Sequence, residues 1–208
     1  MAIKAILFDT EMVRAILEGR KSCTRRIVKP QQLIGMLPDK CKNGAPEKFL
    51  KEKKLMFKPY CDMTDIELIN TAYKAPYQPG DILYVRETWE KAPNGYYYYE
   101  DWQRNDIADV TKWKPSIRMP KEAARIWLKV TDVRVERLQE ISAESALAEG
   151  ADKYIHTNGG LDENMTITSF IGIWNSTIKK SDIDRYGWDA NPYVWIIEFE
   201  RCEKPEGV

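Results

Sequence analysis

The chain has almost no histidine and no paired cysteines, and both shortages limit the chemistry that it can perform. Its 208 residues include one histidine, His156, and four cysteines that form no Cys-x-x-Cys pair. Zinc sites combine cysteine and histidine at close spacing, and a Ser-His-Asp arrangement would depend on that one histidine. The sequence therefore predicts no metal site, and an enzyme built on it would need a base other than imidazole.

Net charge, long apolar runs and glycine-rich phosphate loops are missing as well. Lys+Arg and Asp+Glu both number 32, which argues against a protein that coats nucleic acid through bulk positive charge. There is no secretory signal pattern and no apolar run near membrane-spanning length, so we expect a cytoplasmic protein with free thiols and no membrane partner. No glycine-rich strand–loop–helix segment occurs, so a nucleotide cofactor is not expected either.

The most informative segment that is present is Gly19-Arg20-Lys21-Ser22-Cys23-Thr24-Arg25-Arg26. A helix is predicted before it, beginning at Thr10 and ending at Gly19, and a strand is predicted over 22–28. Lys21 and Thr24 are therefore close enough for their side chains to meet. Burial and neighbouring arginines favour the neutral form of an amine, and a neutral amine can activate a hydroxyl. In the alternative interpretation, the Gly-Arg-Lys run is an ordinary helix end, where cations favour the helix dipole.

The rest of the chain mixes short strands with short helices. Strands are expected at 2–8, 82–85, 126–135 and 193–199, with helices at about 142–150 and 165–180. Asn94-Gly95 predicts a hairpin whose tyrosine run is either an edge strand or a base-stacking surface. A phase change near Thr131-Asp132 indicates a bulge of the kind that barrels require. We predict one α+β domain over 1–208, a small β-barrel flanked by short helices, with a long insertion at about 30–75.

Several motifs together resemble the ASCH domain of the PUA-like superfamily. They are Gly19-Arg20-Lys21-x-x-Thr24-x-Arg26, Pro79-Gly80-Asp81-Ile82-Leu83 and Ala148-Glu149-Gly150. The segments at 12–17, 85–89, 113–117 and 187–192 are similar in particular to its phage- and prophage-associated branch. The resemblance implies a PUA-like β-barrel with a cleft suited to RNA or a modified nucleoside.

One small bacterial ASCH branch is known as an amidohydrolase that removes the acetyl group from N4-acetylcytidine. Similarity to it implies catalytic roles for Lys21, Thr24 and Glu149, with Glu144 as the alternative to the glutamate. Lys21 would take the proton of Thr24, whose oxygen would attack the acetyl carbonyl, while Glu149 would hold Lys21 or help to protonate the leaving amine. This chain is about twice as long as that branch, which leaves its substrate open.

Further residues are predicted to bind the substrate. Arg26 would bind the developing oxyanion or the base carbonyl. Trp89 is either a stacking wall or a core residue, and Arg86 with Glu87 either lines the cleft or forms a cross-strand ion pair. The full set of predicted binding residues is Arg20, Arg26, Arg86, Glu87, Trp89, Lys114 and Ser116.

Three other functions remain open from the sequence. A non-catalytic RNA-binding module would use the same basic strand to bind phosphates. A ribonuclease would use Lys21 and Glu149 on a ribose 2′-hydroxyl. A phage adaptor would dock through residues 30–75.

Overall fold

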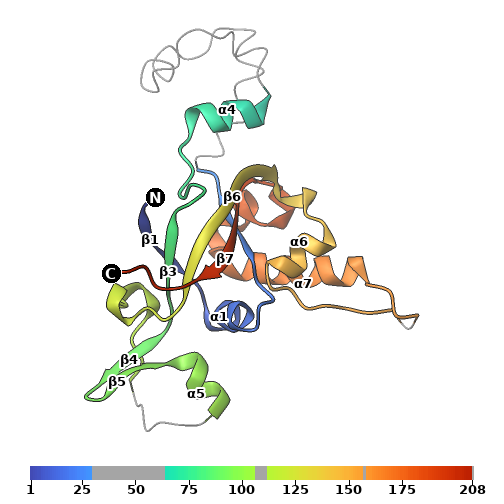
Figure 1. Ribbon diagram of the computed structural model, residues 1–208. Coiled ribbons are helices and arrows are strands. Elements are labelled where there is room, and N and C mark those ends of the chain that lie inside the picture. Colours follow the sequence, from blue (N-terminus) through green and yellow to red (C-terminus); the bar gives the residue numbers. More distant parts are fainter. Residues whose placement is uncertain (30–63, 106–111, 157, 208) are drawn as a thin grey trace.

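The fold is organised by one sheet of five strands in the order β1-β3-β6-β7-β2. The structure is a computed structural model, and it describes residues 1–29, 64–105, 112–156 and 158–207. Strands β6 and β7 cross the centre of the molecule (Figure 1). β1 pairs with β3 in parallel, and the other three ladders are antiparallel. The strands are β1 (Ile3–Leu7), β2 (Cys23–Ile27), β3 (Ile82–Arg86), β6 (Trp127–Arg137) and β7 (Tyr193–Cys202).

The long pair formed by β6 and β7 is bent in the middle. The register between the two strands shifts between Val130 and Asp132, which confirms the phase change expected from the sequence and marks a β-bulge. β3 pairs with the first residues of β6, whereas β2 pairs with Val194–Glu198 of β7. The bend therefore separates the part of the ribbon that carries β1 and β3 from the part that carries β2.

Both faces of the sheet are covered, and alternate residues of β7 belong to two different cores. Tyr193, Trp195, Ile197 and Phe199 pack with β1, β3 and α1. Val194 and Ile196 point the other way and pack with residues of α6 and α7. The helices are α1 (Thr10–Leu17), α4 (Asp65–Ala72), α5 (Tyr99–Asn105), α6 (Ala143–Ala148), α7 (Glu163–Thr177) and α8 (Ile183–Tyr186).

Most of the elements expected from the sequence are present, with small shifts. Helix α1 is capped one residue earlier than expected, because the Oδ1 of Asp9 accepts from the N–H of Met12 at 2.8 Å. The Asn94-Gly95 hairpin forms, as β4 (Trp89–Ala92) and β5 (Gly95–Tyr98). It is a separate two-stranded sheet that projects from the main body (Figure 1). The tyrosine run is therefore not an edge of the main sheet, and Tyr99 already begins α5.

The expected α+β class is confirmed, but the ladder of strands is not closed into a barrel within the described residues. β1 and β2 stand at opposite ends of the strand order. The Nη2 of Arg26 on β2 nevertheless donates to the carbonyl of Leu7 on β1 at 3.2 Å. The sheet therefore curls until its two edge strands approach each other, and a side chain rather than a backbone ladder bridges them.

The expected insertion at 30–75 lies mostly outside the described residues, which resume at 64. Its last part is not the irregular segment expected from the sequence. Thr64 and Glu67 form a capping box that begins α4, and Ile69 and Ala75 are buried in the main core. No described helix is long and apolar enough to cross a membrane.

Asp81, in the turn before β3, fastens the start of β1. Its carboxylate accepts from the Nζ of Lys4 at 2.7 Å and from the N–H of Ala2 at 2.9 Å. The hydrogen bond from Lys4 is the largest cause that holds the pKa of Asp81 below its ordinary value. This contact stabilises the β1–β3 pair, whose far end carries residues of the pocket described below.

Replacing Asp81 should destabilise the fold in a pH-dependent way. We expect Asp81→Asn to lower the free energy of unfolding at pH 7 by about 1–3 kcal/mol, because charge-assisted hydrogen bonds to Lys4 are lost. A lowered folded pKa means that this contribution is complete above the unfolded value of about 4 and disappears as the pH falls through the folded one. Urea unfolding at pH 7 and pH 3 measures both effects. Asp132→Asn, which removes a more exposed ion pair with Arg134, should cost less than about 1 kcal/mol.

Candidate active site

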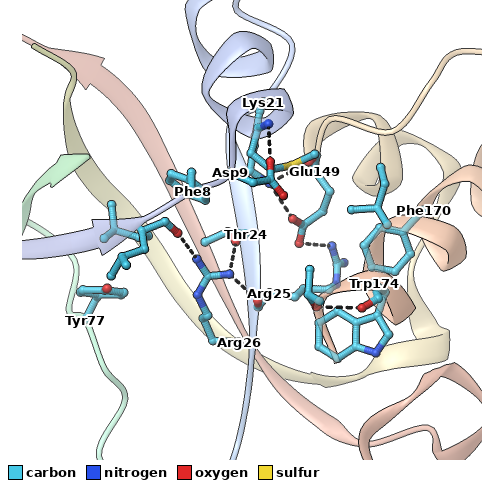
Figure 2. A pocket seen from close by; sticks show the side chains of 15 residues that line it. Phe8, Asp9, Lys21, Thr24, Arg25, Arg26, Tyr77, Glu149, Phe170 and Trp174 are labelled. Atoms are coloured by element: carbon cyan, nitrogen blue, oxygen red, sulfur yellow. Dashed lines mark hydrogen bonds and ion pairs between the residues drawn. The ribbon is translucent and has the colours of Figure 1, made fainter. Parts of the chain in front are cut away.

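A pocket lies where the edge strands β1 and β2 come close to helix α7 (Figure 2). Its volume is about 350 Å³, which is within the range of small-molecule sites. Its walls come from the end of β1, from β2, from α7 and from single residues elsewhere in the chain. The lining residues are Ile6, Leu7, Phe8, Asp9, Met12, Lys21, Thr24, Arg25, Arg26, Tyr77, Glu149, Phe170, Ile173, Trp174 and Thr177.

A buried ion pair joins two of the predicted catalytic residues. The Nζ of Lys21 donates to the Oε2 of Glu149 at 2.8 Å and to the carbonyl oxygen of the same residue at 2.7 Å. The side chains are 1% and 7% exposed. The amine also lies 5.5 Å from the centre of the Phe8 ring. Residues 128 positions apart in the sequence thus form one charged unit in the pocket wall.

Local structure accounts for the position of Glu149. Ser142 caps the first turn of α6, and Glu149 follows the last helical residue. Gly150 then turns the chain with a φ of +94°, and a Cβ at this position would lie 3.2 Å from the Cβ of Ala15 in α1. Only glycine combines this conformation with so close an approach. The end of α6 therefore packs directly against the helix that precedes Lys21.

Thr24 and Arg26 project from one face of β2, as their alternation in a strand requires. Thr24 is 2% exposed, and its Oγ1 accepts from the Nη1 of Arg26 at 2.9 Å. Burial is the largest cause that lowers the pKa of the Arg26 guanidinium, and Glu149 opposes it. No hydrogen bond joins Thr24 to Lys21 among the described residues; the two side chains line the same pocket with different partners.

Arg25 projects from the opposite face of β2, toward α7. Its side chain is 1% exposed, and its Nη1 donates to the Oε1 of Glu149 at 3.2 Å. The guanidinium lies 5.7 Å from the centre of the Phe170 ring. Glu149 is therefore shared by two cations, one on each of its carboxylate oxygens. Figure 2 shows the carboxylate between Lys21 and Arg25.

Cys23 lies beside this cluster and is not poised to react. It is 4% exposed, its Sγ faces the carbonyl of Ser145 at 3.9 Å, and no disulfide forms. Burial first, and Glu149 second, raise the pKa of its thiol to about 12. A thiol with so high a pKa stays protonated and is a poor nucleophile.

The other predicted binding residues do not line this pocket. Arg20 is exposed and pairs with Glu18 at 2.8 Å. Arg86 donates to the carbonyl of Ile117 and to the hydroxyl of Tyr84, so it forms no ion pair with Glu87.

Glu87 instead forms a two-pronged ion pair with Arg125, with both hydrogen bonds at 2.9 Å. Trp89 is 6% exposed and packs in a separate core cluster. It is therefore a core residue, the second of the two interpretations that the sequence left open. Lys114 pairs with Glu90 at 2.6 Å, and Ser116 begins a short 3₁₀ turn.

Sequence reasoning missed several lining residues. Arg25 was visible only as a charged neighbour of Lys21, although strand alternation already placed it opposite Thr24 and Arg26. Phe170 and Trp174 share an apolar helix face, and such a face predicts core without showing that a pocket opens beside it. Tyr77 reaches the pocket from the segment before β3, where its hydroxyl donates to the carbonyl of Ala5 at 2.9 Å.

No family model matches the chain, and no curated protein matches its sequence. Among solved structures, the chain is similar to the crystal structure of an ASCH domain from Lactobacillus crispatus JV V101. The two are 10% identical with a TM-score of 0.40, over 96% of this chain and 79% of that chain. Neither the identity nor the TM-score is high enough to assign the chain to that family.

The three charges at the centre of the pocket give a stability prediction. Glu149→Gln leaves Lys21 and Arg25 buried without a counter-ion, so it should lower the free energy of unfolding by about 3–5 kcal/mol. Lys21→Met should cost less, because Arg25 still pairs with the carboxylate. Urea unfolding midpoints of the wild type, Lys21→Met and Glu149→Gln should fall in that order. As a control, Glu90→Gln removes a more exposed pair with Lys114 and should change the stability little, because exposed ion pairs contribute little. An equal loss of stability in Glu149→Gln, Lys21→Met and Glu90→Gln would contradict a central role for Glu149.

Proposed function

We propose that the protein is an amidohydrolase that acts on an acylated nucleoside such as N4-acetylcytidine. One observation carries the proposal: a buried amine and a buried carboxylate, 2.8 Å apart, share a pocket of about 350 Å³ with the hydroxyl of Thr24. These are the groups that covalent hydrolysis of an amide needs when no histidine is at hand. The resemblance of the Gly-Arg-Lys-x-x-Thr segment to the N4-acetylcytidine amidohydrolase branch supports the choice of substrate.

The reaction would begin with two proton transfers. Lys21 would pass a proton to the Oε2 of Glu149, and the neutral amine would then take the proton of the Thr24 hydroxyl as its oxygen attacks the acyl carbonyl. The short contact between Lys21 and Glu149 supports the first transfer. The hydrogen bond from Arg26 to the Thr24 oxygen would stabilise negative charge as it forms there.

The second half of the reaction would return the enzyme to its starting state. The tetrahedral oxyanion formed by the attack collapses and the bond from the acyl carbon to N4 breaks. N4 receives the proton that the Lys21–Glu149 pair took from Thr24, which leaves an acyl ester on Thr24. Water would then hydrolyse the ester and release the carboxylic acid. The pair therefore serves as base in one step and as acid in the other.

A nucleoside-binding module without catalysis is the second candidate. One observation favours it: Lys21 and Thr24 are hydrogen-bonded to Glu149 and Arg26, not to each other. A binding pocket does not require that contact, whereas a hydrolase must form it during the reaction. A ribonuclease would use the same Lys21–Glu149 pair on a ribose 2′-hydroxyl and would have no role for the buried hydroxyl of Thr24.

Incubation with N4-acetylcytidine, followed by chromatography for cytidine, tests the proposal. We expect deacetylation, and we expect Lys21→Ala and Thr24→Val each to slow it by about 10²–10⁴-fold because base or nucleophile is lost. Thr24→Ser should retain activity, since it keeps the hydroxyl.

Matched controls make the same chemical changes on the surface. Thr168→Val alters an exposed threonine of α7, and Lys129→Met alters an exposed lysine of β6; neither should change the rate. Deacetylation that persists in Lys21→Ala and Thr24→Val would overturn the mechanism. Binding of the nucleoside with no cytidine released would favour the non-catalytic module.

A further inference from the structure

One group in the pocket is buried without its full set of hydrogen bonds. The Nε and Nη2 of Arg25 are buried and have no hydrogen-bond partner among the described residues, although Nη1 is bonded to Glu149. A buried donor that makes no hydrogen bond destabilises the folded protein, and such groups in native proteins call for an explanation. The pocket that Arg25 lines provides one.

The two unpartnered donors have a fixed geometry. The guanidinium is planar, and its Nε–H and Nη2–H bonds point in parallel along one edge. Such an edge fits two acceptor atoms that lie side by side in one plane. Phe170 packs against the guanidinium and Glu149 holds Nη1, so the orientation of this edge is set by two contacts before any ligand arrives.

The charge of the pocket favours an acceptor-rich ligand. Among the residues that the structure describes, Lys21, Arg25 and Arg26 contribute three cations to the pocket lining, and Glu149 and Asp9 contribute two carboxylates. Arg26 cannot take the role of Arg25, because its Nη1 donates to Thr24 and its Nη2 donates to Leu7.

We propose that the Nε/Nη2 edge of Arg25 recognises a cytosine ring through its O2 and N3 atoms. The choice of cytosine rests on the proposed function, whereas the need for two adjacent acceptors follows from the unpartnered donors of Arg25 alone. In an N4-acylated cytosine, O2 and N3 are adjacent acceptors, and the acylated nitrogen is on the neighbouring ring carbon. The acylated nitrogen would then lie beside the recognised edge of the base, in the pocket that Lys21 and Thr24 also line. Uracil carries a donor at N3 and would not fit.

Calorimetric titration of the intact protein with cytidine and with 3-deazacytidine tests this inference. The second nucleoside lacks only the N3 acceptor. We expect cytidine to bind about tenfold or more tightly, the discrimination typical of a two-bond arginine contact. Arg25→Met, and Arg25→Lys, which keeps the charge but loses the paired donors, should bind the two nucleosides equally. Arg201→Lys, on an exposed residue of β7, should keep the preference.

The outcomes separate this inference from the proposed function. Neither nucleoside carries an acyl group, so a preference for cytidine that depends on Arg25 upholds the inference even if N4-acetylcytidine is not hydrolysed. Equal binding by the wild type overturns it even if hydrolysis occurs, and this comparison needs no variant to fold. Binding of guanosine or inorganic phosphate that depends on Arg25, without binding of cytidine, overturns the assignment to cytosine.

Discussion

The carboxylate of Glu149 holds the site together, because two buried cations, Lys21 and Arg25, share it. Lys21 bonds to one of its oxygens and Arg25 to the other. Removing such charges from water is costly, and the attraction between them offsets the cost only when the geometry is good. The same contacts tie the end of α6 to the start of β2, where the N–H of Ser22 also donates to the carbonyl of Ala148. The contacts of Glu149 with Lys21 and Arg25 therefore stabilise the fold and form the site at the same time.

The pocket beside the Glu149 carboxylate exists because the sheet is not closed between β1 and β2. A ladder closed between β1 and β2 would fill the space with backbone hydrogen bonds. Instead, Arg26 spans the gap and leaves room for a cavity between the two strands and α7. Because β2 is an edge strand, side chains from both of its faces reach the cavity. Thr24 comes from the face that covers the main core, and Arg25 comes from the face that α7 covers.

Local patterns in the sequence predict the elements well. The left-handed glycines at 19 and 150, the cap at Ser142 and the phase change in β6 each depend on a few neighbouring residues, so each can be read from a short segment. Lys21, Thr24 and Arg26 could be predicted as one cluster for the same reason. Arg86, Glu87, Trp89, Lys114 and Ser116 were predicted to bind the substrate, but they do not line the pocket. A charged or aromatic residue near a strand end looks the same in sequence whether it faces a cleft or a neighbouring element. Arg25 escaped notice because its importance depends on which strand lies at the edge of the sheet.

The use of both faces of β2 constrains how this strand can vary. A shift of one residue in its pairing with β7 would exchange the faces. Arg25 would then point into the apolar core beside Ile197, and Thr24 would point toward Phe170. The paired register, with Thr24 opposite Ile197 and Arg25 opposite Ile196, is therefore enforced by charge as well as by shape. An insertion or deletion within 23–27 would remove the site and the fold together, so variation in length should be confined to segments outside this strand.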